Sequence, residues 1–296
     1  MTSIKDKMKT TGVWYFTDGM TAAESGEFAS RVEALGYSAL WVPETVGRDS
    51  LINASTLLRA TESLIVATGI ANIYNRHPGL MKQGAFSLAE LSGGRFVLGI
   101  GVSHAPMVEG VRKLDASKPL GTMRSYLDGM DASPWGGPAI DEEPLVVVAA
   151  LGPKMLALSA EKSAGAHPYW TTPAHTAQAR EIMGPDAWLC VEQKVVLSTN
   201  REDAHAKTDE QLERYHRLPN YRNNWKRLGF SEDEIESRNP RFLDAVMAWG
   251  DADAINARIS QHYDAGADHV CIQPVHPTAP PGTVHWEALE ALAPTS

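Results

Sequence analysis

A short pattern occurs three times along this chain: a helix-like stretch ends at a glycine, and an apolar run of β-type residues follows at once. The glycines are Gly36, Gly165 and Gly266, and the runs that follow them cover residues 37–42, 166–170 and 267–272. A glycine suits the left-handed conformation that commonly closes a helix. Helices that alternate with buried strands build a parallel sheet covered by helices, so the pattern predicts an α/β fold.

Eight apolar runs qualify as strands, and helical patterns separate them. The runs cover residues 12–17, 38–43, 64–70, 96–101, 145–149, 166–170, 187–197 and 268–273. Eight strands alternating with helices predict a (β/α)8 barrel, also called a TIM barrel, and an open doubly wound sheet is the alternative. A chain of 296 residues fits either fold as one domain, so we expect a single domain over residues 1–296.

The spacing of the strands is irregular once, between the seventh and the eighth. Residues 200–241 hold nine acidic and nine basic side chains there and predict a helical insert. The balanced charges are typical of solvated helix faces. Three aromatic residues of the insert could instead cover a pocket or contact a second copy of the chain, namely Tyr215, Tyr221 and Trp225.

Charge and cysteine content exclude several classes of protein. The chain carries 27 Lys and Arg against 36 Asp and Glu, a net charge of -9, which disfavours a nucleic-acid partner. The apolar run Gly12–Phe16 is too short for a leader or a membrane span, so we expect a cytoplasmic protein with no membrane partner. Cys190 and Cys271 each lie in a predicted strand without metal-ligand spacing, which indicates a reduced compartment and no structural metal.

In a barrel the active site lies where the strands end, so the residues after each strand are the candidates. Gly152-Pro153-Lys154 follows the fifth strand and begins a helix whose free N–H groups suit a phosphate, although an ordinary strand-to-helix turn fits equally. Gly99-x-Gly101 is a weaker signal, because the rest of a dinucleotide motif is missing.

Two titratable residues at strand ends are candidates for proton transfer. His104 follows the fourth strand and could exchange a proton near neutral pH, and Glu44 follows the second strand. Each could also be an ordinary polar loop residue. Lys194 lies inside the seventh strand beside charged neighbours, so we expect no inward lysine for Schiff-base chemistry. An anion site with few ionisable groups favours a redox cofactor that carries the chemistry itself.

Four motifs, in order along nearly the whole chain, resemble the luciferase-like monooxygenase superfamily. They are Trp41-Val42-Pro43-Glu44, Thr68-Gly69-Ile70-Ala71-Asn72 with Arg76-His77-Pro78, Leu98-Gly99-Ile100-Gly101-Val102-Ser103-His104, and Ala150-Leu151-Gly152-Pro153-Lys154. The sequence is most similar to the branch of coenzyme F420-dependent oxidoreductases. Gly165-Ala166-His167-Pro168-Tyr169 is among the stretches that resemble a largely uncharacterised subgroup of that branch.

The resemblance implies a barrel whose third strand ends in a bulge with a non-proline cis peptide, here Gly69-Ile70, behind the deazaflavin ring. It places the cofactor phosphate at Gly152-Pro153-Lys154, after the fifth strand. It places the edge of the ring system at Asn72, Gly101 and Ser103. The implied cofactor contacts are Gly69, Ile70, Asn72, Gly101, Ser103, Ala150, Leu151, Gly152, Pro153 and Lys154.

The sequence departs from better-known members of the superfamily after the second strand. Many relatives carry an Asp-His pair there, whereas this chain has Glu44-Thr45, and a threonine cannot replace an imidazole as acid or base. Some relatives place a carboxylate proton donor where this chain has His104. We therefore expect His104, or secondarily Glu44, to handle the proton.

Three hypotheses about function follow from these observations. The first is an F420-dependent oxidoreductase that moves a hydride to or from a small organic substrate. The second is an FMN-dependent monooxygenase that uses reduced flavin and oxygen, and the third is a barrel that has lost its activity. Relatives commonly form dimers, so we expect a homodimer.

Overall fold

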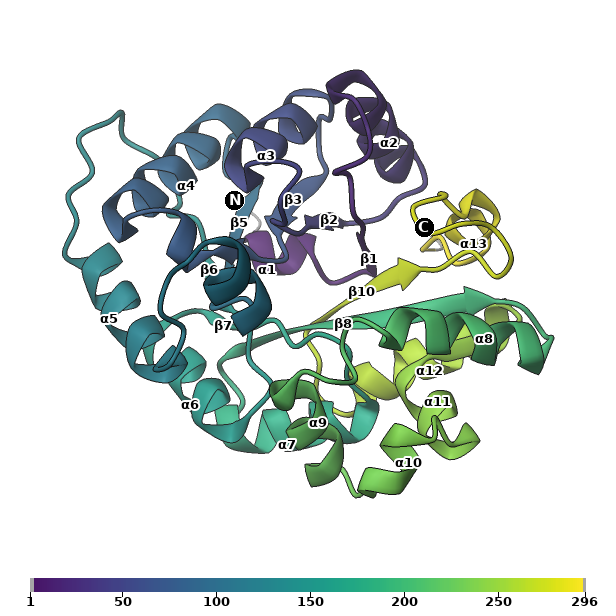
Figure 1. Cartoon of the computed structure of the whole chain (residues 1–296). Coiled ribbons are helices and arrows are strands. Elements are labelled where there is room, and N and C mark those ends of the chain that lie inside the picture. The colour runs from purple at the N-terminus through teal and green to yellow at the C-terminus, as the bar shows by residue number, and fades with distance from the viewer. Residues whose placement is uncertain (1–2, 295–296) are drawn as a thin grey trace.

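The computed structural model describes residues 3–294, and its centre is a closed barrel of eight parallel strands (Figure 1). The barrel strands are β1 (Gly12–Trp14), β2 (Ala39–Val42), β3 (Ile65–Thr68), β5 (Phe96–Gly101), β6 (Val146–Val148), β7 (Gly165–Ala166), β8 (Trp188–Leu197) and β10 (His269–Pro274). Strand β1 pairs with β2 and β10, and β10 also pairs with β8, so the sheet closes on itself. The predicted (β/α)8 barrel is confirmed over the open sheet. The outermost two residues at each end of the predicted domain lie outside the described residues.

Helices connect the strands and surround them, as Figure 1 shows. They are α1 (Ile4–Lys7), α2 (Ala22–Ala34), α3 (Ser50–Arg59), α4 (Pro78–Ser92), α5 (Pro119–Asp131), α6 (Pro153–Lys162), α7 (Pro173–Met183), α12 (Ala252–Asp264) and α13 (Trp286–Ala291), with the 3₁₀ turn η1 (Ile73–Asn75) and the π-helical turn η2 (Pro106–Val111). Between residues 3 and 294, no helix combines the length and the hydropathy that a membrane crossing requires.

The strands bury apolar side chains on both of their faces. One cluster fills the barrel interior and includes Trp14, Trp41 and Trp188, while a larger cluster lies between the strands and the helices. Neighbouring residues such as Leu40 and Trp41 belong to different clusters, because successive side chains of a strand point to opposite faces. Burial on both faces explains why the predicted strands lack a clean alternation of polar and apolar residues.

The three glycines of the repeated pattern have two different roles. Gly36 and Gly266 follow their helices with φ angles of +83° and +98°, which confirms the predicted caps. The prediction is wrong for Gly165, since α6 ends at Lys162 and Gly165 already begins β7. A Cβ atom on Gly165 would lie 1.8 Å from the carbonyl oxygen of Trp188. Glycine is needed there because the two backbones approach closely.

The third barrel strand is interrupted where the sequence predicts it. Strand β3 ends at Thr68, the Gly69-Ile70 peptide bond is cis, and β4 (Ala71–Asn72) then pairs with β5. The backbone N–H of Glu44 donates to the carbonyl of Ile70 at 3.1 Å and helps hold this bulge in place. The expected bulge with a non-proline cis bond is therefore confirmed.

The predicted insert is present and is built around an apolar cluster that also includes Trp170 and Val196 of the barrel. It consists of α8 (Arg201–Leu212), α9 (Pro219–Arg227), α10 (Glu232–Glu236) and α11 (Pro240–Val246), which lie together beside β8 in Figure 1. Trp225, Phe242 and Met247 are central to its core. A short strand that the sequence pattern missed, β9 (Ala248–Gly250), pairs with the last residues of β8 and joins the insert to the barrel.

Candidate active site

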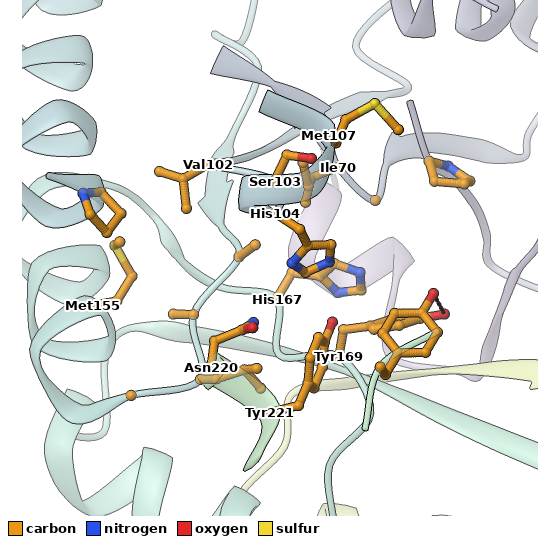
Figure 2. A pocket seen from close by; sticks show the side chains of 18 of the residues that line it. Ile70, Val102, Ser103, His104, Met107, Met155, His167, Tyr169, Asn220 and Tyr221 are labelled. Carbon is orange, nitrogen blue, oxygen red and sulfur yellow. Dashed lines mark hydrogen bonds between the residues drawn. The ribbon is translucent and has the colours of Figure 1, made fainter. Parts of the chain in front are cut away.

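The carboxyl ends of the strands surround a cavity of about 420 Å³, within the usual range of roughly 300–1,000 Å³ for ligand pockets (Figure 2). Eight of the predicted site residues line it, and they come from the loops after β2, β3, β5 and β6. These residues are Glu44, Gly69, Ile70, Ser103, His104, Ala150, Leu151 and Gly152. The structure thus brings most of the predicted site together at one end of the barrel.

Four predicted cofactor contacts do not line this cavity. Asn72 is buried, and its side chain caps η1 by accepting from the N–H of Tyr74. Gly101 lies behind Ile70, whose side chain would be 2.7 Å from a Cβ atom on Gly101. Pro153 and Lys154 are exposed on the first turn of α6. Direct contacts of these four residues with a cofactor remain predictions.

The floor of the cavity is formed around the backbone of Gly69. The indole N–H of Trp14 donates to the carbonyl oxygen of Gly69 at 3.0 Å. A Cβ atom on Gly69 would be 2.6 Å from Nε1 of Trp14 and 3.2 Å from Nε2 of His167. Only glycine leaves this floor open, so a flat ligand can approach the peptide backbone directly.

His167, which the sequence argument did not include in the site, also lines the cavity. Its ring stacks on Trp41 with 4.3 Å between ring centroids, and its Nδ1 lies 2.9 Å from the carbonyl oxygen of Cys190. Burial lowers the pKa of His167 to about 4, so the ring is neutral and Nδ1 donates to that carbonyl. Its place directly after β7 was the available signal in the sequence.

Glu44 is held by several partners at the rim of the cavity. Its carboxylate forms an ion pair with Arg76 and accepts the backbone N–H of Asn72 at 2.7 Å. The side chains of Glu44 and Arg76 are 3% and 10% exposed. These contacts fix the loop after β2 to the bulge of β3, and they lend no support to the predicted proton transfer by Glu44. The neighbouring Thr45 donates its hydroxyl to Asp18.

His104 lies at the opposite wall, close to two tyrosines of the insert. Its ring centroid is 5.6 Å from that of Tyr221 and 6.3 Å from that of Tyr215, and Figure 2 shows it pointing into the cavity. Burial lowers the pKa of His104 from 6.5 to about 4. The imidazole is therefore uncharged at neutral pH, when it can accept a proton but has no readily released proton to donate.

One end of the cavity suits an anion. Helix α6 begins at Pro153 after Gly152, and no side chain caps its first turn. Arg227 of the insert reaches this point, because its Nη2 would be 3.6 Å from a Cβ atom on Gly152. An uncapped helix start and a guanidinium form a common phosphate-binding combination. The sequence argument missed Arg227 because it assigned the charges of the insert to a solvated face.

Behind Tyr169, at the other end of the cavity, lies a buried ionic cluster, and here the expectation for Lys194 is wrong. Its side chain is fully buried, with Nζ 2.6 Å from the hydroxyl of Tyr169 and 3.3 Å from the carboxylate of Glu192, and it also donates to Gln273. Glu192 and Lys194 are two residues apart on β8, so both side chains lie on the same face of that strand. This spacing was the signal that could have revealed the pair.

Burial shifts the pKa values of the titratable groups in this cluster. It lowers the pKa of Lys194 to about 8, although the Glu192 carboxylate opposes the shift. Burial also raises the pKa of Glu192 and holds the pKa of the Tyr169 hydroxyl well above its ordinary value. Groups shifted in this way beside a cavity are characteristic of functional sites.

Comparison with known proteins agrees with the barrel and the position of its cavity. The family model described as "Luciferase-like monooxygenase" matches residues 6–269. The chain belongs to this family. The resemblance of the four strand-end motifs to this family is thereby confirmed.

The curated relatives include reductases and a monooxygenase. The 5,10-methylenetetrahydromethanopterin reductase of Methanolobus tindarius is 28% identical over 156 residues, which cover 47% of each chain. The chain spans about half or less of the length of the curated relatives that it matches.

Two solved structures illustrate the shared fold. An F420-dependent secondary alcohol dehydrogenase in complex with an F420-acetone adduct has a TM-score of 0.72 at 15% identity and covers 95% of this chain and 97% of its own. The oxygenating constituent of 3,6-diketocamphane monooxygenase from Pseudomonas putida, in complex with FMN, has a TM-score of 0.66 at 16% identity and covers 97% of both chains. At these identities the likeness shows the fold alone.

Proposed function

We propose that this luciferase-like barrel is an oxidoreductase that transfers a hydride between coenzyme F420 and a small organic substrate. The observation that carries the proposal is the combination, in one cavity, of an open backbone floor at Gly69 and an anion site at Gly152 and Arg227. A flat ring system that carries a phosphate fits this combination. The F420-dependent secondary alcohol dehydrogenase among the similar structures supports the choice of cofactor.

The residues present fit such a cofactor in chemistry as well as in shape. Ile70, Val102 and Met155 supply apolar walls, and Figure 2 shows them around one part of the cavity. Gly152 and Arg227 would hold the phosphate, with Lys154 nearby on the surface of the same helix. When bound, the deazaflavin supplies a carbon that accepts and donates hydride.

The chain itself binds and orients the cofactor and the substrate and excludes water from them, while its side chains carry out the proton transfer. Tyr215 and Tyr221 of the insert form part of the cavity wall and shield it from solvent. Neutral His104 lines the cavity and is the candidate from the sequence for accepting the proton when an alcohol is oxidised. Removal of its ring by His104→Ala should slow oxidation of the substrate and change its pH profile. An unchanged rate and profile would remove His104 from the mechanism.

The experiment that tests the proposal is a titration of the purified protein with F420 and with FMN, followed by fluorescence quenching and calorimetry. The proposal expects saturable F420 binding that is tighter than FMN binding. FMN binding without F420 binding would overturn it in favour of the flavin monooxygenase, for which the likeness to an FMN-bound oxygenase is the specific support. If neither cofactor bound, the barrel would be one that has lost this activity.

The setting in which the enzyme works forms a second part of the proposal. We infer a cytoplasmic homodimer that acts on a small molecule and has no nucleic-acid or membrane partner. The acidic chain argues against a nucleic-acid partner, and the two free, buried cysteines fit a reducing compartment. Sedimentation equilibrium tests the dimer. A single species with the mass of one chain would contradict it.

A further inference from the structure

We propose that Tyr215, Tyr169 and Lys194 form a proton path ending at the oxygen of the substrate, and that the substrate pair is a carbonyl compound and its alcohol. This inference rests on the proposed hydride transfer and deepens it. Tyr215 is assigned as the catalytic acid that touches the substrate, whereas Tyr169 and Lys194 act through it.

The path is a continuous series of hydrogen bonds from the barrel interior to the cavity. Nζ of Lys194 donates to the hydroxyl oxygen of Tyr169 at 2.6 Å, and this hydroxyl lies 3.3 Å from that of Tyr215. Tyr169 and Tyr215 both line the cavity, and Figure 2 shows two hydroxyl groups joined by a dashed line beside the ring of Tyr169. The path therefore connects a buried cation with the space a ligand would occupy.

The hydrogen-bonding capacity of each group identifies the end of the path. Lys194 has three N–H donors, and they meet Tyr169, Glu192 and Gln273. Tyr169 accepts from Lys194, while its own proton can go to Gln273 at 3.0 Å or to Tyr215. Among the described residues, the hydroxyl of Tyr215 has Tyr169 as its one hydrogen-bond partner. Tyr215 can thus still donate its proton to a ligand.

The hydroxyl pair stands near the junction of two cavities. A second cavity, of about 600 Å³, is lined by Gln273, the residue that also accepts from Tyr169. Both cavities share Phe16, Thr45 and Met107, so they adjoin one another. A substrate that enters through the second cavity reaches the tyrosines and the cofactor space at the same point.

The charged and titratable groups that face Lys194 come from four segments. Glu192 precedes it on β8, Cys271 lies on β10, Arg214 follows α8, and Tyr169 follows β7. The rings of Trp170 and Tyr169 lie 4.5 and 4.3 Å from Nζ and favour the ammonium form. Burial opposes them and lowers the pKa of Lys194 to about 8, so it is mostly protonated at pH 7 yet can release its proton.

The proposed step balances as follows in the direction of reduction. The carbonyl carbon receives a hydride from the reduced cofactor, and the π electron pair of the C=O bond moves to the oxygen. That oxygen takes the hydroxyl proton of Tyr215, Tyr215 takes that of Tyr169, and Tyr169 takes a proton from Lys194. Lys194 is left as a neutral amine, and it regains its proton from solvent after the alcohol leaves.

The path is an alternative to His104 at the substrate oxygen, because the same group must donate the proton in reduction and accept it in oxidation. With a pKa lowered to about 4, His104 has no proton to donate at neutral pH. Burial raises the pKa of Tyr215 and holds that of Tyr169 well above the ordinary value. Each phenol therefore stays protonated until it donates, and the preceding group of the path then replaces its proton. Reduction of a carbonyl needs such an acid at its oxygen.

The first measurement needs neither cofactor nor substrate. Lysine labelled with ¹³C at the ε carbon reports its titration by NMR, and one resonance should titrate near pH 8 and vanish in Lys194→Met. Tyr169→Phe should move that midpoint lower still, because the ammonium loses an acceptor. Tyr221→Phe is the matched control and should leave the midpoint unchanged, since no hydrogen bond joins Tyr221 to the path. A midpoint that Tyr169→Phe does not move would overturn the coupling.

The second measurement uses protein loaded with reduced F420 and mixed with small ketones and aldehydes at a series of pH values. Cofactor oxidation in the wild type should slow above about pH 8, as Lys194 loses its proton. Tyr215→Phe should lower the rate by about 10²-fold and remove this alkaline decline. Tyr221→Phe should keep the decline, whatever its effect on the rate itself.

The outcomes separate the two proposals. F420 that binds to the wild type, together with an unchanged pH profile in Tyr215→Phe, overturns the proton path alone. Failure of the wild type to bind F420, whether or not it binds FMN, overturns the proposed function, and the path as a catalytic device falls with it. A lost alkaline decline in Tyr215→Phe, with the shifted Lys194 midpoint in Tyr169→Phe, supports the path.

Discussion

The two sides of the cavity use buried charges in different ways. On the side built by the loops after β2 and β3, Glu44 and Arg76 bind each other and the backbone of the bulge. On the side built by β8, β10 and the insert, the hydrogen bonds of Lys194 lead through Tyr169 towards the cavity. A buried charged residue near the cavity can thus support the site or act in it, and its hydrogen-bond partners decide which.

This contrast reverses the expectation from the sequence. Glu44 occupies the position where a barrel places catalytic groups, yet its contacts are structural. The sequence argument excludes Lys194 because of its charged neighbours, yet those neighbours are the groups that keep a buried lysine in place. Four substitutions test the contrast in order of decreasing effect, one beside the bulge of β3, two on the side of β8 and the insert, and one at the start of α6.

The largest effect is expected from Arg76→Met. It leaves the nearly buried carboxylate of Glu44 without its cation, and breaking a buried ion pair costs about 3–5 kcal/mol. Urea unfolding followed by circular dichroism measures the free energy of unfolding. Arg124→Met is the control, since Arg124 pairs with Glu161 on the surface and its loss should cost less than about 1 kcal/mol. Equal losses in both variants would contradict a structural role for the Glu44 pair.

Lys194→Met should destabilise the fold less, by about 1–3 kcal/mol at pH 7, the range for buried polar groups left unpaired. The cost is smaller because Glu192, whose pKa burial already raises, can take up a proton. A folded-state pKa above the unfolded value means that the folded state binds the extra proton, so the stability of this variant falls as pH rises above 4.5. Unfolding at pH 5 and pH 8 checks the sign. A deficit that is larger at pH 5 would refute the explanation.

Arg227→Glu tests the insert side through ligand affinity. The substitution removes a guanidinium near Gly152 and places a carboxylate there, so F420 should bind about 10–100-fold more weakly, as expected when one hydrogen bond to a charged group is lost. Calorimetry measures the change, and the melting temperature of the free protein shows whether the fold is intact. Undiminished affinity would exclude Arg227 from the phosphate site.

Lys154→Glu should have the smallest effect, a weakening of F420 binding by a few fold. Lys154 is exposed on the first turn of α6 and does not line the cavity, so its charge acts through solvent. The same titration at 20 and 300 mM salt should show that the difference from the wild type shrinks. An effect larger than that of Arg227→Glu would show that the Gly152-Pro153-Lys154 motif, and not the insert, holds the phosphate.

Most of the fold could be predicted because its signals are local. The capping box of Thr21 and Glu24, the glycine caps and the apolar runs each depend on a few neighbouring residues. Strand β9 was missed because three residues, Ala248–Gly250, pair only after the insert has folded back onto β8. Gly165 was misassigned because a close approach of two distant backbones leaves the same mark in the sequence as a helix cap.

Only the part of the site that the strand-end motifs form could be predicted from the sequence. Gly69, Ser103 and Gly152 lie in the loops that follow β3, β5 and β6, where position alone indicates a role. Tyr215 and Arg227 reach the cavity from an insert whose path is set by packing between distant segments, which no local pattern reveals. The role of Lys194 depends on Tyr169 and Gln273, from segments 25 and 79 residues away.

The insert shares its core with the barrel. Trp225, Phe242 and Met247 belong to one apolar cluster with Trp170, which follows β7, and Val196 of β8. Tyr215 and Arg227 face the cavity from this insert. A graft that carries the proposed proton path and phosphate site to another luciferase-like barrel would therefore have to transfer the insert together with the barrel residues that it packs against.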